Sequence, residues 1–403
     1  MIRPAYHHAF EPNGRATRVR ALATNSRLIN PSLSSVMAAY LHSLATAVPS
    51  NAYGQEQILE VMKAWHGQDR RTNRLLGGIY RASAIEQRHS VVDDFQPGNP
   101  GGFFFDLAKD AFLNPSTAER NEKYAQEAGK LASCAARRAL SGEAAFSPTE
   151  ITHLITVSCT GFYAPGPDLD VVRELGLSER VERYHLGFMG CYAAFPAMRL
   201  ARSICMAHEG AVVLVVAVEL CSLHLQAGKE SDELLAASVF ADGAAAALVS
   251  ARPPAGRPSF RLSRFNSALA TDASDDMAWT IGDTGFRMVL SSEIPKIVER
   301  EVGAALAPLW ECAGISAADM GAWAVHPGGR AILDGFEAGL GLPSDSLTAS
   351  REVLSRYGNM SSATILFVLD RLLRSEKRLA GPVTAVAFGP GLAVESALLE
   401  LAA

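Results

Sequence analysis

The stretch Tyr184-His185-Leu186-Gly187-Phe188-Met189-Gly190-Cys191-Tyr192-Ala193-Ala194 decides how this sequence folds. Helix formers follow Cys191, and Pro196 falls in the first turn of the expected helix, where its missing N–H costs nothing. We therefore predict that Cys191 opens a buried helix ending near Ala207. The helix dipole favours a thiolate there, whereas apolar neighbours oppose it, so a nearby cation is needed. Taken alone, Cys191 is best interpreted as a core cysteine, since free cysteines are among the most buried residues.

The composition restricts the class of protein. With 403 residues, the chain can bury a large core, as one big domain or two fused ones. A net charge of -5 without a basic patch argues against a nucleic-acid partner. Six cysteines without metal-ligand spacing predict reduced thiols in a cytoplasmic protein, with no disulfide framework and no metal site. The longest apolar run, Ala211 to Leu220, is too short to span a bilayer, and no secretory signal is visible.

Hydrophobic periodicity predicts alternating strands and helices. In the first half we expect strands at 39–44, 151–158, 211–218 and 244–249, and helices over 55–92, 117–142 and 191–207. In the second half we expect helices over 292–313, up to 357 and over 358–373, and strands at 322–325, 383–388 and 392–399. This alternation predicts an α/β sheet covered on both faces.

The second half repeats the plan of the first. Gly190-Cys191 precedes a helix and a strand, and Gly358-Asn359 does the same. We interpret this as an internal duplication. It divides the chain into an N-terminal extension (1–37), a half with the cysteine (38–250) and a half with His326 and Asn359 (251–403). A pseudo-twofold axis would bring the two helix starts towards a shared centre.

Three residues near these junctions carry chemistry. Cys191, His326 and Asn359 each lie close to glycine where a strand or loop meets a helix. A protonated histidine would supply the cation that stabilises the thiolate. Asparagine would donate an N–H to an oxyanion. Each residue alone would be structural, but together, at duplicated positions, they favour catalysis.

These residues lie within four motifs that occur in order along the chain. The chain resembles the type III polyketide synthases, the chalcone- and stilbene-synthase-like branch of the thiolase-fold enzymes, and is most similar to bacterial alkylresorcinol and alkylpyrone synthases. The resemblance runs from about residue 38 to residue 401. Initiating ketosynthases share the Cys/His/Asn set, but Asn-Met-Ser-Ser and Phe-Gly-Pro-Gly resemble the polyketide branch. The motifs are Gly190-Cys191, Val325-His326-Pro327-Gly328-Gly329, Tyr357-Gly358-Asn359-Met360-Ser361-Ser362-Ala363 and Phe388-Gly389-Pro390-Gly391.

The resemblance implies a fold and a reaction. The fold would be thiolase-like, with two duplicated α/β halves in five layers (αβαβα), and the protein would be a homodimeric acyltransferase. Cys191 would take an acyl group from acyl-CoA, while His326 and Asn359 would hold malonyl-CoA during decarboxylation. No cofactor is implied beyond these CoA substrates, and no stable membrane insertion.

The resemblance also assigns cavity positions. Phe240 matches a gatekeeper phenylalanine between the CoA tunnel and the cavity. Met288 replaces a second gatekeeper that is usually phenylalanine, so this wall would be softer. Cys221 and His224 replace residues that are often threonine in plant enzymes. The remaining implied substrate-binding positions are Ala164, Trp279, Ser361, Gly389, Pro390 and Gly391.

Two of these departures suggest a substrate. Ala164 stands where, in the family, a larger methionine from the partner subunit often plugs the cavity wall, so alanine would leave room for a long acyl tail. Trp279 stands where plant chalcone synthases have glycine, which would narrow the space in which the polyketide folds. In the family, basic residues of the segment that holds Arg74 and Arg81 usually bind the CoA phosphates. From the sequence alone, these arginines would be interpreted as the solvent-exposed face of a helix. The implied CoA-binding residues are Arg74, Arg81, Gly328, Gly329, Arg330 and Ala331.

We therefore expect an alkylresorcinol-type synthase with a long-chain fatty acyl-CoA starter, repeated malonyl extension and aldol ring closure. Alkylpyrone formation by lactonisation is one alternative. All-malonyl synthesis of phloroglucinol or tetrahydroxynaphthalene is another. A catalytically idle thiolase-fold partner that only dimerises would be a different class of protein, and the intact Cys191, His326 and Asn359 set argues against it.

Overall fold

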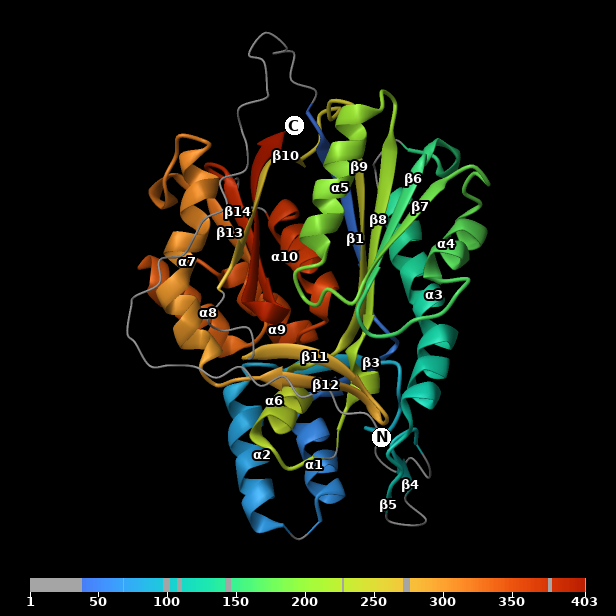
Figure 1. Cartoon of the computed structure of the whole chain (residues 1–403), viewed down its shortest axis with the longest axis vertical. Helices are drawn as coiled ribbons and strands as arrows, with labels where there is room; N and C mark the ends of the chain where they lie inside the picture. The colour runs from blue at the N-terminus through green and yellow to red at the C-terminus, as the bar shows by residue number, and fades with distance from the viewer. Residues whose placement is uncertain are drawn as a thin grey trace, which may run out of the picture.

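The computed structural model describes residues 38–67, 69–96, 102–106, 111–141, 146–226, 228–270, 276–375 and 379–402. The predicted N-terminal extension, 1–37, lies outside the described residues. Figure 1 shows five layers, in which helices alternate with two parts of a sheet. This arrangement confirms the predicted thiolase-like α/β fold.

Nine strands of the described chain form one sheet, in the order β13-β14-β15-β10-β1-β9-β8-β6-β7. Its two parts meet where β1 pairs with β10, through Tyr40 opposite Arg261 and Leu41 opposite Phe260. The strands are β1 (Tyr40–Ala47), β6 (His153–Ser158), β7 (Glu182–Gly187), β8 (Val212–Leu220), β9 (Asp242–Ser250), β10 (Ser259–Leu269), β13 (Ala322–Val325), β14 (Val383–Gly389) and β15 (Ala393–Ala402).

Strand pairing shows the duplication directly. In the first part, β6 is parallel to β8, β8 is antiparallel to β9, and β9 is antiparallel to β1. In the second part, β13 is parallel to β14, β14 is antiparallel to β15, and β15 is antiparallel to β10. The first part carries one further strand, β7, beside β6. The two parts therefore share one topology.

The helices occupy three layers. Two helices, α5 (Ala194–Ala207) and α10 (Thr364–Leu373), lie between the two parts of the sheet (Figure 1). The outer face of the first part is covered by α3 (Thr117–Ser141) and α4 (Pro167–Leu175). The outer face of the second part is covered by α7 (Ile294–Glu311) and α8 (Arg330–Leu340), with α9 (Thr348–Tyr357) below them.

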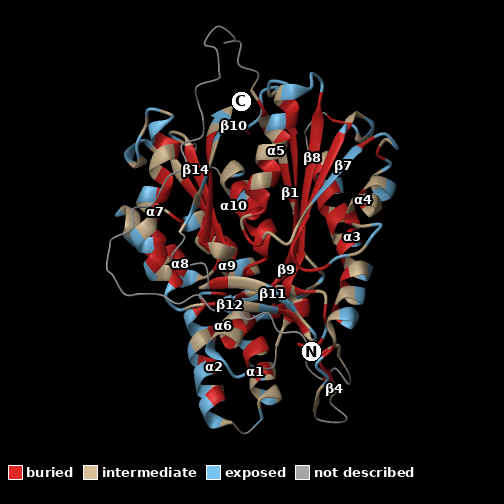
Figure 2. Cartoon of the chain, viewed as in Figure 1, coloured by how far each residue is buried: buried red, intermediate tan, exposed pale blue. Residues whose placement is uncertain are grey.

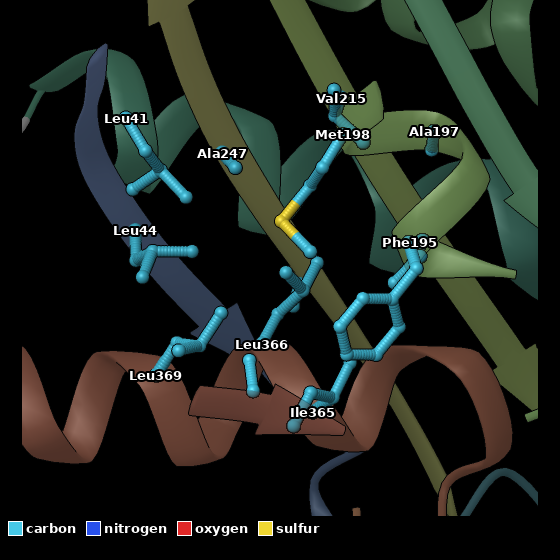
Figure 3. Close-up of a cluster of buried hydrophobic side chains, with 14 of the residues drawn as sticks. Leu41, Leu44, Phe195, Ala197, Met198, Val215, Ala247, Ile365, Leu366 and Leu369 are labelled. Carbon is cyan, nitrogen blue, oxygen red and sulfur yellow. The ribbon is translucent and has the colours of Figure 1, made fainter. Parts of the chain in front are cut away.

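The central helices share one hydrophobic core with the inner faces of the sheet. Phe195 and Met198 from α5 meet Ile365 and Leu366 from α10, and Val215 from β8 lies beside them (Figure 3). Full burial of each large side chain contributes about 1.5–3 kcal/mol. Strands covered on both faces appear as continuous apolar runs, and Figure 2 shows them buried along their length. This core holds the two helix starts in place.

A smaller group of elements lies at one end of the sheet (Figure 1). The prediction of helix throughout 55–92 is wrong for its last part. The helix α2 ends at Ala82, and the following strand β3 (Gln87–Ser90) pairs with β2 (Asn51–Gly54). The strands β7 and β10 and the β11–β12 hairpin were not predicted. The group comprises β2 (Asn51–Gly54), α1 (Gln55–Trp65), α2 (Arg70–Ala82), β3 (Gln87–Ser90), β4 (Phe105–Asp106), β5 (Ala111–Phe112), α6 (Ser231–Val239), β11 (Met277–Gly282) and β12 (Gly285–Leu290).

The chain reaches α5 through a turn that requires glycine. Gly190 has φ of +85°, a conformation that L side chains rarely adopt. A Cβ atom there would lie 2.4 Å from Cδ of Pro390, which follows β14. Glycine at position 190 therefore lets the two halves of the duplication touch beside Cys191.

This contact predicts a difference between two glycine substitutions. Gly210 has a similar φ of +81°, with nothing near its hypothetical Cβ. Gly210→Ala should cost about 1 kcal/mol of unfolding free energy from the backbone alone. Gly190→Ala should cost about 1–3 kcal/mol more, from the clash with Pro390. Urea unfolding of both variants measures the difference, and equal losses would show that the contact contributes nothing.

Candidate active site

The structure brings the three predicted residues to one buried place. Cys191 lies in the turn between β7 and α5, which begins at Ala194 and not at Cys191 as predicted. His326 directly follows β13. Asn359 lies between α9 and the short 3-10 turn that precedes α10. Their exposures are 8% for Cys191, 1% for His326 and 3% for Asn359, so bulk water is largely excluded.

Short contacts fix the Asn359 side chain. Its Nδ2 donates to the carbonyl oxygen of Gly328 at 3.2 Å, and its Oδ1 accepts the backbone N–H of Ser361 at 2.8 Å. These two partners determine which way the amide points. The thiol of Cys191 lies within hydrogen-bonding reach of the side chains of Ser361 and Asn359. An amide has two N–H donors, so one remains to be directed at the sulfur or at a bound oxygen.

His326 reaches the same place from the second half of the chain. Its backbone N–H donates to Val386 on β14 at 2.8 Å, and its carbonyl accepts the N–H of Gly328 at 3.0 Å. Gly328 is also the residue that holds Asn359. Within the described part of the chain, neither ring nitrogen of His326 has a hydrogen-bond partner. A buried imidazole without partners is available to a substrate.

Burial keeps both groups neutral in the free site. It raises the pKa of the Cys191 thiol to about 12, although hydrogen bonds from Ser361 and Asn359 oppose the rise. Burial lowers the pKa of His326 to about 3. Burial therefore opposes the predicted thiolate–imidazolium pair in the free site. Desolvation disfavours the thiolate and the imidazolium alike. Transfer of the proton from the Cys191 sulfur to the His326 imidazole would form these two opposite charges in one step.

A buried carboxylate beside the thiol was not predicted. Glu219 ends the apolar run of β8 and is fully buried, which raises its pKa. It accepts the backbone N–H of Cys159 at 3.0 Å and the hydroxyl of Thr160 at 2.9 Å, and Ser362 also donates to it. The sulfur of Cys159 lies 3.1 Å from Oγ of Ser361. The one signal in the sequence was an acidic residue inside a buried apolar strand.

A cavity lies between α6, β3 and the β11–β12 hairpin; Cys191, His326 and Asn359 do not line it, but Phe240, whose backbone bridges to Asn359, does. Three rings form one of its walls: His224 stacks on Phe286 at 4.0 Å, and Trp279 meets both edge to face. Trp279 is fixed because its Nε1 donates to the carbonyl of Cys159 at 2.9 Å. The lining also includes three of the predicted substrate-binding residues, Cys221, Phe240 and Met288, and the apolar side chain of Ile58.

Hydrogen bonds make the histidine of this wall structural. Nε2 of His224 lies 2.7 Å from the carbonyl of Thr160, and Nδ1 accepts the backbone N–H of Phe286 at 3.1 Å. Burial lowers its pKa to about 3. His224 is therefore a neutral, fully bonded ring that occupies space where a smaller residue would leave a void.

Comparison with protein families agrees with this geometry. The model described as "Chalcone and stilbene synthases, N-terminal domain" matches residues 30–253, and the corresponding C-terminal model matches residues 266–402. The chain belongs to the chalcone and stilbene synthase family. It is a type III polyketide synthase, a class of acyltransferase that uses acyl-CoA and malonyl-CoA in general.

Solved structures of type III polyketide synthases are similar over nearly the whole chain. PKS-I from the brown alga Ectocarpus siliculosus is 30% identical, with TM-score 0.84, covering 90% of this chain and 98% of that one. The C-terminal type III domain of 'Steely1' from Dictyostelium is 27% identical, with TM-score 0.83 and coverages of 91% and 100%. The fungal enzyme ORAS is 27% identical, with TM-score 0.77 and coverages of 90% and 99%.

Other predicted residues of this polyketide synthase lie around the site. Ser361 is buried beside the two thiols. Gly389, Pro390 and Gly391 lie behind the Cys191 turn, where Pro390 packs on Gly190. They do not line the cavity described above.

The predicted wall residue Ala164 is exposed in this chain, in the loop after β6. The bond between Ala164 and Pro165 is cis. Phe162 in the same loop is 39% exposed and touches the rings of Phe188 and Phe286. The loop is therefore an exposed extension of the cavity wall.

Of the predicted CoA contacts, the three arginines and Ala331 are exposed, whereas Gly328 is buried and Gly329 half-buried. Arg74 and Arg81 are exposed on α2. Arg330 and Ala331 open α8, and Arg330 pairs with Asp334 at 3.3 Å. Gly328 and Gly329 precede that helix, next to His326 and Asn359. These positions leave the CoA assignment as a prediction.

The described residues form neither a cluster of metal ligands nor a membrane-spanning helix. Nowhere in the described part of the chain do three or more His, Cys, Asp or Glu side chains gather as a metal site. No helix there combines the length and apolar character needed to cross a bilayer.

The neutral free site predicts how Cys191 reacts with iodoacetamide. Because the thiolate is the nucleophile and the pKa lies near 12, the alkylation rate should rise roughly tenfold per pH unit, from about pH 6 to pH 10. Peptide mass spectrometry measures the rate at Cys191, and the exposed Cys312 reports the reactivity of the reagent. A plateau at neutral pH would instead show a standing thiolate–imidazolium pair.

Proposed function

We propose that Cys191 carries the growing chain and that His326 and Asn359 activate malonyl-CoA. The observation that carries this proposal is the convergence of a buried thiol, an unpartnered imidazole and an oriented amide next to a largely apolar cavity. The starter proposed is an acyl-CoA with an apolar chain, and the product an alkylresorcinol.

In the loading step, the sulfur of Cys191 attacks the thioester carbonyl of the starter. Its proton passes to the unprotonated ring nitrogen of His326, which has no hydrogen-bond partner in the described residues. The bond from the acyl carbon to the CoA sulfur then breaks, and His326 returns the proton to that sulfur. The acyl group is left on Cys191 and free CoA departs.

In the extension step, the thioester oxygen of malonyl-CoA accepts hydrogen bonds from His326 and Asn359. The bond to the carboxylate breaks, CO₂ leaves, and its electron pair forms an enolate whose oxygen those donors stabilise. The enolate carbon attacks the acyl carbonyl on Cys191, and the sulfur leaves as the chain moves to CoA. Donors already held by Gly328 and Ser361 need little reorganisation when the oxyanion forms.

The cavity supports an apolar chain. Beyond Phe240 and Met288 its lining includes Ile58, Phe95 and Leu225, and it extends beneath α6. Burial of each CH₂ group of an acyl tail there contributes about 0.8 kcal/mol. This route differs from the predicted one through Ala164, which is exposed in the described chain.

One observation favours a second candidate, all-malonyl synthesis of a compact phenolic product. His224, Trp279 and Phe286 together occupy much of the cavity wall nearest to Cys159 and Cys221. Such a wall leaves less space for a bulky starter. Products formed from malonyl-CoA alone, compared with those from a panel of fatty acyl-CoA starters, distinguish the two candidates.

We also propose a homodimer through the edge formed by β7 and the 162–165 loop. β7 pairs with β6 and lies at the end of the strand order, so its other edge is open. Tyr184 on β7 and Phe162 in the loop are each 39% exposed. A second copy would cover these apolar groups, and Ala164 would face it. Light scattering distinguishes this dimer from a monomer.

The assigned roles predict different defects in two variants. Cys191→Ala should abolish polyketide products but retain slow decarboxylation of malonyl-CoA, because the enolate donors remain. Asn359→Ala should slow decarboxylation about 100-fold or more and leave starter loading near normal. Rapid-quench measurements separate acylation from decarboxylation. An Asn359 variant that decarboxylates normally but cannot be acylated would reverse its role.

The fixed indole of Trp279 predicts control of cyclisation. Trp279→Gly should shift products from resorcinols towards pyrones, because removal of the ring frees chain folds that lactonise. Ile281→Gly is the matched control, since Ile281 is on the same face of β11 but is 57% exposed. Product profiles with one fatty acyl-CoA measure the ratio. An unchanged ratio in the Trp279 variant, or pyrones alone from wild type, would contradict the alkylresorcinol proposal.

A further inference from the structure

The C-terminal end of α6 lies against the loop that carries Asn359. Helix α6 ends at Val239, and Phe240 follows it as the C-cap. The last carbonyls of any helix lack partners within that helix, and burial makes unpaired carbonyls costly. The partners of these carbonyls therefore show what holds this end of α6.

Arg88, on β3, supplies two of the four partners directly. Its Nη1 donates to the carbonyl of Ala237 at 2.8 Å and to that of Phe240 at 2.7 Å. Its Nε donates to Oε1 of Gln55 at 2.9 Å, and Nε2 of Gln55 donates to the carbonyl of Ser238 at 2.7 Å. Arg88 thus satisfies two carbonyls directly and orients the side chain that satisfies a third.

The remaining carbonyl, that of Val239, accepts a hydrogen bond from the backbone of Asn359, the proposed catalytic asparagine. The backbone N–H of Asn359 donates to Val239 at 2.8 Å, and its carbonyl accepts the N–H of Ala241 at 2.9 Å. The preceding Gly358 rests on the stem of Arg88, since a Cβ there would lie 3.0 Å from Cγ and Cδ of the arginine. Arg88 therefore touches both the end of α6 and the loop of Asn359.

The charge of Arg88 suits this place. The side chain is 6% exposed and forms no direct ion pair in the described chain, although the buried Asp242 is close enough to favour its charge. Its positive charge instead meets the negative end of the α6 dipole. Nη2 has no hydrogen-bond partner in the described residues, and the guanidinium lies over the ring of Tyr80 at 5.7 Å. A buried arginine arranged in this way acts on the backbone around it.

We propose that Arg88 is a positioning residue that holds Asn359 and the gate residue Phe240 in register. This inference rests on the proposed role of Asn359 as the enolate donor. Without Arg88, the carbonyls of Ala237 and Phe240 lose a partner and the end of α6 shifts. The backbone of Asn359 moves with it, because the two are hydrogen-bonded. Cys191 belongs to a different turn and should not be affected.

The test compares two partial reactions in Arg88→Met, which keeps the stem and removes the donors. Decarboxylation of malonyl-CoA should fall about 10- to 100-fold. Acylation of Cys191 by a starter should fall by a clearly smaller factor, which reflects only the place of Arg88 in the cavity wall. Arg88→Lys should recover part of the loss. Tyr80→Phe is the matched control, because its hydroxyl shares the carbonyl of Ala237 with Arg88, and it should leave both steps near normal.

Each outcome has a defined meaning. Equal loss of both steps, or unchanged decarboxylation, in Arg88→Met overturns the proposal. If that variant does not fold, Arg88→Lys decides, since it must still lose more decarboxylation than acylation. Asn359→Ala in the same assay separates the two levels of the argument. Normal decarboxylation by the Asn359→Ala variant would contradict the proposed role of Asn359. Slow decarboxylation by Asn359→Ala together with normal decarboxylation by the Arg88 variants would contradict only the positioning role of Arg88.

Discussion

The shared core between α5 and α10 is the contact on which the rest of this structure depends. Side chains such as Phe195 and Ile365 fill the space between the two parts of the sheet (Figure 3). Because the halves have the same topology, the two central helices begin at related places. Their starts meet at the centre, where the chain before α5 carries Cys191 and the chain before α10 carries Asn359.

The same burial sets the chemistry of the site. Water is largely excluded around Cys191 and His326, and this desolvation opposes a charge on either group before substrate arrives. A site of this kind stabilises charge that develops during reaction, provided that its donors are already oriented. Gly328 and Ser361 orient the amide of Asn359, and the end of α6 holds its backbone. In the proposed reaction, the amide of Asn359 therefore stabilises the oxyanion from an orientation that backbone contacts fix before substrate binds.

The sequence alone was sufficient to predict those strands and helices whose pattern of apolar residues follows directly from their burial. The run at Val212 to Leu220 predicts a strand because both of its faces are covered, and Gly190 and Gly358 mark the loops that meet at the centre. The strand β7 escaped prediction because four of its six residues, Glu182 to His185, are exposed and polar or aromatic. Tertiary pairing, not local pattern, makes it a strand.

The buried polar residues escaped prediction for a related reason. Arg88 and Glu219 appear in the sequence as ordinary charged residues, and only the folded chain shows that their partners are distant backbone groups. The exposure of Ala164 depends on how a loop lies. The free-state charges of Cys191 and His326 also could not be predicted, because the extent of desolvation follows from packing.

A crystal structure of the enzyme with a non-hydrolysable malonyl-CoA analogue tests the central claim most directly. The account predicts that the carbonyl oxygen of the analogue lies within hydrogen-bonding distance of a ring nitrogen of His326 and of Nδ2 of Asn359, with its reactive carbon facing the sulfur of Cys191. An analogue whose carbonyl contacts neither residue, although its CoA portion is bound, would contradict it.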